Sequence, residues 1–246
     1  MSDEQNPVEN SSRFATTQWS MVVSAGKKSS PDSEKALESL CEIYWFPLYA
    51  YVRRRVADAN EAQDLTQSFF AELLEKNYVG AADPDRGRFR AFLLTALKHY
   101  LSKQWEKEKA LKRGGGKQRL SLDFESADSS IKLQLASGLS PEQLYDQQWA
   151  VALLGRIMQR LRTEHVENEK VELFDELKDF VIGDHSGRSY ADAAATLNIS
   201  EAASRKAASR IRQRYRELLR EEISHTVSDG NDVDQEIRNL FSTFQS

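Results

Sequence analysis

The stretch from Ser189 to Arg220 limits most strongly what this chain can fold into. Ser189 can cap a short helix by accepting amide protons from its first turn. Asn198 tolerates the left-handed backbone of a tight turn, and Ser200 can then cap a second, longer helix. Small residues in both helices allow the close crossing that a helix-turn-helix requires. These residues are Ala193, Ala194, Ala207 and Ala208. The stretch therefore predicts a helix-turn-helix near the end of the chain.

The second helix of this motif is strongly basic. Residues 205–220 contain seven Lys or Arg against one Glu, which gives a net charge of +6. A helix with this charge is suited to bind the phosphate backbone of a nucleic acid.

The rest of the chain distributes its charge unevenly, although the net charge of the whole is only −4. Residues 86–119 carry eleven Lys or Arg against two acids, a net charge of +9. Residues 121–184 carry a net −7, and residues 221–246 a net −5. Two basic segments in an acidic chain indicate contact with nucleic acid at two chosen places, and little indiscriminate binding elsewhere.

Apolar residues recur at helical spacing through most of the chain, and no segment shows the alternation of a strand. We therefore expect an all-α protein of two helical domains joined by a flexible linker, the C-terminal domain being a helix-turn-helix. The expected parts are an N-terminal extension (1–30), a helical domain (31–113), a linker (114–139), the helix-turn-helix domain (140–224) and an acidic tail (225–246).

Local signals predict where several helices begin or bend. Ser140 and Gln143 form a capping box around Pro141, which marks a helix start. Pro47 should kink or divide the helix that begins near residue 31. A second helix should begin near Asn60. Apolar residues after position 232 allow a short docking helix at the end of the chain.

Enzyme chemistry finds little support in the sequence. The four histidines are far apart, and none has metal-ligand spacing. They are His99, His165, His185 and His225. The glycine run before Lys117 fails as a phosphate loop because Gln118 replaces the expected Ser or Thr and no strand precedes it. We expect no metal, no cofactor and no catalytic residue.

A single cysteine, Cys41, excludes an intramolecular disulfide, and its place on an apolar helical face predicts a buried residue. The first residues lack the order of a signal peptide, and no apolar run approaches the ~18 residues that span a membrane. We expect a cytoplasmic protein without membrane insertion.

Several segments resemble the extracytoplasmic-function sigma factors of bacterial RNA polymerase, which belong to the sigma-70 family. The likeness is strongest to the long variants of planctomycete type. Residues 40–55, 61–70 and 88–97 resemble the second sigma region, and the helix-turn-helix resembles the fourth. The resemblance implies a sigma factor that binds core RNA polymerase and promoter DNA, promotes strand opening, and is not itself an enzyme. It leaves open an anti-sigma factor or a kinase as a regulatory partner.

The resemblance also implies roles for individual residues. The family's pattern for docking on the polymerase clamp helices falls on Asp64, Leu65, Gln67 and Phe70. The positions with which the family opens the promoter at the minus-ten element correspond here to Lys98, His99, Lys103, Trp105, Lys107 and Arg113. The helix that recognises the minus-thirty-five element carries Arg205, Lys206, Ser209, Arg210 and Arg212. The chain departs from the family at Phe92, often Trp, and at Ser204, usually apolar.

Two other functions stay open on the sequence alone. One is a stand-alone helix-turn-helix regulator that binds duplex DNA without polymerase. The other is a degenerate sigma-like protein that only sequesters a partner. A further hypothesis concerns the acidic tail, which could shield the basic recognition helix in the free protein.

Overall fold

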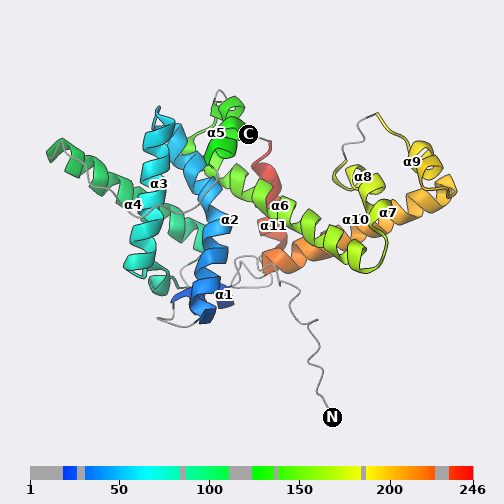
Figure 1. Ribbon diagram of the computed structural model, residues 1–246, viewed down its shortest axis with the longest axis horizontal. Coiled ribbons are helices and arrows are strands. Elements are labelled where there is room, and N and C mark those ends of the chain that lie inside the picture. Colours follow the sequence, from blue (N-terminus) through cyan, green and yellow to red (C-terminus); the bar gives the residue numbers. More distant parts are fainter. Residues whose placement is uncertain are drawn as a thin grey trace, which may run out of the picture.

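The chain is all-α in a computed structural model that describes residues 19–26, 31–83, 87–110, 124–135, 138–183, 187–224 and 233–245. Every regular element among these residues is a helix, so the prediction of an all-α fold is confirmed. Figure 1 shows α2, α3 and α4 at one side of the molecule and α7, α8 and α9 at the other, with the long helix α6 between them. None of the described helices is both long and apolar enough to cross a membrane. The glycine run at 114–116 and Arg113 lie outside the described residues.

Four α-helices and a short 3-10 helix make up the N-terminal half. They are α1 (Trp19–Gly26), α2 (Pro31–Arg55), α3 (Ala59–Glu75), η1 (Tyr78–Ala81) and α4 (Phe89–Ala110). Their core is rich in aromatic residues, with Tyr44, Tyr49, Tyr51 and Phe69 almost completely buried. Aromatic side chains bury large apolar areas, so this half has a substantial core of its own.

Two sequence predictions concern the helix boundaries in this half. Pro47 was expected to kink or divide its helix, and the helix is not divided: α2 runs from Pro31 to Arg55 with Pro47 buried inside it. The surrounding core holds the helix together although one backbone donor is missing. The next helix begins at Ala59, close to the predicted start near Asn60. Its cap is Asp58, whose side chain accepts from the Glu61 amide at 2.9 Å.

The expected linker contains a helix, α5 (Phe124–Leu135). Phe124, Ala127 and Ile131 are buried, at the spacing of one helical face. Asp128 fixes α5 to α2, because it accepts hydrogen bonds from Tyr49 Oη at 3.1 Å and from Arg53 Nε at 2.7 Å. Residues 124–135 are therefore packed against the first half.

The C-terminal half consists of further helices. They are α6 (Pro141–Glu167), α7 (Val171–Leu177), α8 (Asp179–Ile182), α9 (Tyr190–Thr196), α10 (Glu201–Ser224) and α11 (Val233–Ser242). The capping box of Ser140 and Gln143 is present at the start of α6, as predicted. Lys178 separates α7 from α8. The short terminal helix forms as α11.

The two halves are in direct contact through α6. Its first turns lie along α2 and α4, where Trp149 and Leu153 are buried and Tyr145 Oη donates to the Arg90 carbonyl at 3.0 Å. Arg54 of α2 donates to the Leu139 carbonyl at 3.0 Å just before α6 begins. One continuous hydrophobic cluster therefore joins α1 to α11. The helix α6 belongs to both halves and fixes their relative position.

Candidate nucleic-acid and polymerase interface

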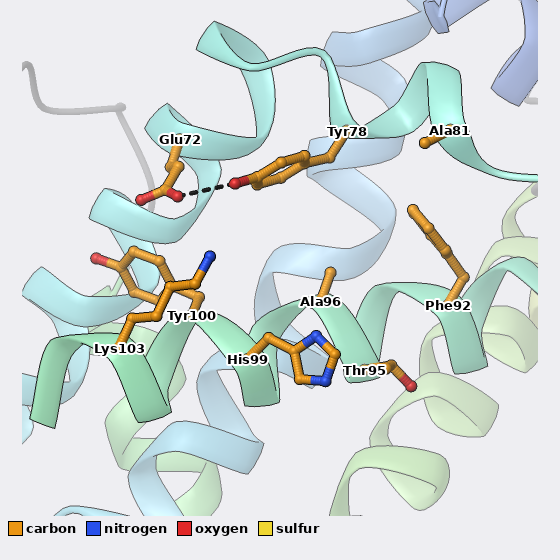
Figure 2. Close-up of a pocket in the computed structure, with 9 residues that line it drawn as sticks. All are labelled: Glu72, Tyr78, Ala81, Phe92, Thr95, Ala96, His99, Tyr100 and Lys103. Carbon is orange, nitrogen blue, oxygen red and sulfur yellow. Dashed lines mark hydrogen bonds between the residues drawn. The ribbon is translucent and has the colours of Figure 1, made fainter. Parts of the chain in front are cut away.

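A pocket of about 310 Å³ lies between α3, η1 and α4 (Figure 2). Its walls combine aromatic rings with a carboxylate and two basic side chains. It is lined by Glu72, Tyr78, Ala81, Phe92, Thr95, Ala96, His99, Tyr100 and Lys103. Tyr78 Oη donates to Glu72 at 3.0 Å, and this bond holds the phenol ring across one wall. The pocket is thus mostly apolar with a few polar groups at its edge, as small-molecule and base-binding sites commonly are.

The wall that carries Tyr78 is fixed by a close contact between α1 and η1. Asn77 adopts a left-handed conformation (φ 49°), and its side-chain amide donates to the Gly26 carbonyl at 3.0 Å. A Cβ atom added at Gly26 would lie only 2.8 Å from the Gly80 Cα, so this approach requires glycine at position 26. A Cβ atom at Gly80 would lie 2.9 Å from Asn77 Nδ2 and would displace that side chain. Sequence reasoning missed this arrangement, because nothing local links Gly26 to a loop more than fifty residues away.

The residues predicted to open DNA divide between two faces of α4. His99 and Lys103 line the pocket, and Lys107 follows one turn later on the exposed surface. Lys98 and Trp105 lie on the other face, toward α2 and α6. Arg113, the remaining residue of this set, lies outside the described residues. The structure therefore brings together only part of the predicted set at one place.

The second face of α4 is occupied by contacts within the protein. Lys98 forms an ion pair with Glu142 of α6 at 2.7 Å, and this pair lowers the pKa of the Glu142 carboxyl. Trp105 is partly buried beneath the Arg55 guanidinium, which lies 5.1 Å from the ring centroid. These two side chains support the packing of α2 and α6 against α4.

The four residues expected to contact polymerase differ in exposure. Asp64 is exposed on α3. Leu65, Gln67 and Phe70 are buried, and the Phe70 ring packs edge-on against Phe69. Burial of Gln67 was not foreseen, because a polar residue in a helix is usually placed at the surface.

The helix-turn-helix has the predicted local structure. Ser189 and Asp192 form a capping box at the start of α9, and Asn198 supplies the left-handed turn with φ 53°. Ser200 Oγ accepts from the Ala203 amide at 3.2 Å and caps α10. Ala193 and Ala208 are completely buried where the two helices cross. These small residues allow the close helix crossing that the sequence predicted. The crossing leaves the first turns of α10 at the surface of the protein.

Most predicted recognition residues are exposed along this outward part of α10. Lys206, Ser209 and Arg210 are exposed. Arg205 is also exposed, but it forms an ion pair with Glu201 at 2.6 Å and lies 4.9 Å from the Tyr190 ring centroid. Exposed pairs of this kind are weak and can rearrange when a phosphate approaches.

Two other side chains of α10 serve the fold. Arg212 points back into the domain and donates to the Phe180 carbonyl at 3.2 Å and to Tyr190 Oη at 3.1 Å. Ser204 is completely buried, and its hydroxyl has no hydrogen-bond partner among the described residues. A polar group buried in this way costs stability at the crossing of α9 and α10.

The described residues contain no group of three or more His, Cys, Asp or Glu that could hold a metal ion. Burial, together with Glu38 and Glu42, raises the pKa of the Cys41 thiol to about 12. This thiol is a poor nucleophile, because only the thiolate reacts readily.

Comparison with known families adds one finding to this geometry. Residues 47–110 match the model of sigma-70 region 2, a segment that includes α3, η1 and all of α4. The match supports a sigma factor of the sigma-70 family. It also supports RNA polymerase binding and promoter melting by this region-2-like segment, and a non-enzymatic role in transcription initiation. No curated protein and no solved structure matches the chain.

Proposed function

We propose that this protein is an extracytoplasmic-function sigma factor of planctomycete type. It binds core RNA polymerase in the bacterial cytoplasm, directs it to a set of promoters, helps to open the DNA, and performs no covalent chemistry itself. The observation that carries this proposal is the pocket between α3, η1 and α4, which lies within the segment that matches sigma-70 region 2. An anti-sigma factor or a kinase would be the natural regulator of such a protein.

The pocket is suited to an unpaired base of the non-template strand. The rings of Tyr78, Phe92 and Tyr100 offer apolar surfaces, and base–aromatic stacking is worth about 1–3 kcal/mol per base. Glu72 can accept a hydrogen bond from an exocyclic amino group. His99 and Lys103 stand at the edge, where they can contact the phosphates on either side of the base.

The basic face of α10 is suited to duplex DNA. Lys206, Ser209 and Arg210 lie together on the exposed side of the first three turns, where a recognition helix contacts the major groove. Phosphate contacts give affinity, and base-edge contacts from one or two side chains give selectivity. Arg205 joins this surface once its pair with Glu201 opens. Arg212 contributes by holding α10 in place.

For the polymerase contact, Asp64 is the residue of the predicted set with an exposed side chain. We propose that it meets the clamp helices directly. Leu65, Gln67 and Phe70 support the contact by fixing the surface of α3 from inside the core.

Two substitutions separate the proposed contacts from changes in stability. Asp64→Ala on α3 should weaken co-purification with core polymerase. The control Glu34→Ala removes an exposed carboxylate on α2 and should not weaken it. Phe92→Ala should reduce strand opening, measured by the fluorescence of 2-aminopurine placed in the minus-ten element, while core binding is kept. Asp64→Ala with unchanged core binding would contradict the docking proposal. Tight binding of a dimer to duplex DNA without polymerase would favour a stand-alone regulator, and core binding without strand opening would favour a sequestering protein.

A further inference from the structure

The last helix of the chain buries a carboxylate against two arginines at the start of α4. Glu236 of α11 has no exposed surface. It forms an ion pair with Arg88 at 2.5 Å and a second one with Arg90. The sequence suggested that the acidic tail shields the recognition helix. In the structure the buried carboxylate Glu236 lies against the start of α4. Among the described residues of the tail, Asp234 forms an ion pair with Arg220 of α10 at 2.5 Å.

Arg90, one of the two arginines, is held by contacts that do not involve α11. The Arg90 guanidinium lies 4.1 Å from the Trp149 ring centroid, and its side chain is only 12% exposed. Tyr145 of α6 donates to the Arg90 backbone carbonyl, and Asp146 lies 3.7 Å from its Nε. Because Trp149, Tyr145 and Asp146 all belong to α6, the Arg90 guanidinium should keep its position when α11 leaves. Arg88 is 37% exposed and its guanidinium is then available at the surface.

The attachment of α11, in contrast, is shallow. The helix has ten residues, and helices this short are not stable alone in water. Its buried side chains are Val233, Glu236 and Leu240. Phe241 and Phe244 remain 44% and 41% exposed at its end. Both partners of the Arg220–Asp234 pair are more than half exposed, so this pair adds little. Glu236 is therefore the main polar contact that holds α11 in place.

We propose that Arg88 and Arg90 form a binding site for a phosphate of the DNA backbone, and that Glu236 occupies this site in the free protein. Two guanidinium groups converging on one carboxylate offer the donors that a phosphodiester also needs. Arg88 precedes Phe92, a residue of the base pocket, by four positions, which is the spacing of neighbours on one helix face. Arg90 faces α6 instead, where it contacts Trp149. The site therefore lies at the first turn of α4, and Arg88 is the member nearest the face that carries the pocket. The inference rests on the proposed function, because the competitor of α11 is promoter DNA.

A direct test compares full-length variants by fluorescence anisotropy with a short labelled single-stranded DNA. Glu236→Gln removes the competing charge. At 0.1 M salt each additional phosphate contact should raise affinity about fivefold and steepen the salt dependence by about 0.7 in log–log slope. The matched control is Asp234→Asn, which removes the exposed carboxylate of the same helix and should leave affinity unchanged. Adding Arg88→Gln and Arg90→Gln to Glu236→Gln should abolish the gain.

Hydrogen exchange in the unaltered protein gives a second test that needs no substitution. Saturating DNA should increase exchange of the amides of residues 233–242, because α11 leaves its site. Unchanged exchange there, or wild-type DNA affinity for a folded Glu236→Gln protein, would overturn the inference and make α11 a purely structural helix. A failure of the proposed function would give a different result. The wild-type protein and the Glu236→Gln variant would then both fail to bind DNA, and Lys103→Ala would not change DNA affinity.

Discussion

Glu222, near the end of α10, should make the stability of this protein fall as pH rises. Its side chain is only 6% exposed, and one carboxylate oxygen accepts from Arg160 Nη1 at 3.1 Å. The other oxygen has no hydrogen-bond partner among the described residues. Burial raises the pKa of this carboxyl from 4.5 to about 7, and Arg160 and Arg156 offset only part of that effect. The folded protein therefore holds a proton that the unfolded chain has already released.

The size of the effect follows from this pKa difference. Below pH 4.5 the group is protonated in both states, and it costs no stability. Between pH 4.5 and 7 the unfolded chain ionises first, so stability falls. Above pH 7 the full cost is present, about 3 kcal/mol from the pKa difference and about 2 kcal/mol after allowance for partial solvent screening. Glu222→Gln keeps the shape and an acceptor for Arg160 but removes the charge.

Urea denaturation of wild type and Glu222→Gln between pH 4.5 and 8 measures this cost. The variant should match the wild type at the acidic end and exceed it by about 2 kcal/mol at pH 8. Glu221→Gln is the matched control, because Glu221 also contacts Arg160, at 3.1 Å, but is exposed. Its effect should stay within about 0.5 kcal/mol at every pH. A Glu222→Gln protein that is less stable than wild type at pH 8, or a difference independent of pH, would refute the reasoning.

Three further predictions concern the helix-turn-helix. Ser204→Ala should raise the free energy of unfolding by about 1 kcal/mol, because it removes a buried hydroxyl that has no hydrogen-bond partner among the described residues. The control Ser209→Ala should not raise it. Equal thermal melts of Ser204→Ala and the wild type would contradict this prediction. Asn198→Ala should lower stability by about 1 kcal/mol through its left-handed backbone, and Asn198→Gly should restore it; a stable Ala variant would count against the strain. Arg210→Ala should weaken binding to duplex DNA, reduce the log–log slope of affinity against salt by about 0.9, and leave the melting temperature unchanged. Arg212→Ala should instead lower the melting temperature. The reverse pattern would show that the two roles are misassigned.

The sequence predicted best those features that short-range chemistry determines. The caps at Ser140 and Ser189 and the turn at Asn198 each depend on a few neighbouring residues, and the structure contains all three. The exposed basic side of α10 follows from helical periodicity once Ala193 and Ala208 are buried.

Features that depend on contacts between residues far apart in the chain could not be predicted from the sequence. The helix α5 has only a short apolar stripe within polar sequence, and it becomes stable by packing Phe124 against Tyr49, with 5.1 Å between the ring centroids. The pocket wall depends on the approach of Gly26 to Gly80, which no local pattern indicates. The position of Glu236 against α4 likewise joins residues almost 150 positions apart. For the candidate site, residue types were predictable but their division between faces of α4 was not.

Reconstituted transcription tests the central claim most directly. The full-length protein would be mixed with core RNA polymerase and fragmented genomic DNA, and transcript starts would be mapped. The account predicts discrete, promoter-dependent transcripts that require the protein and that are lost with Phe92→Ala, although core binding persists. No promoter-dependent transcript, together with no binding to core polymerase, would contradict the assignment of this chain as a sigma factor.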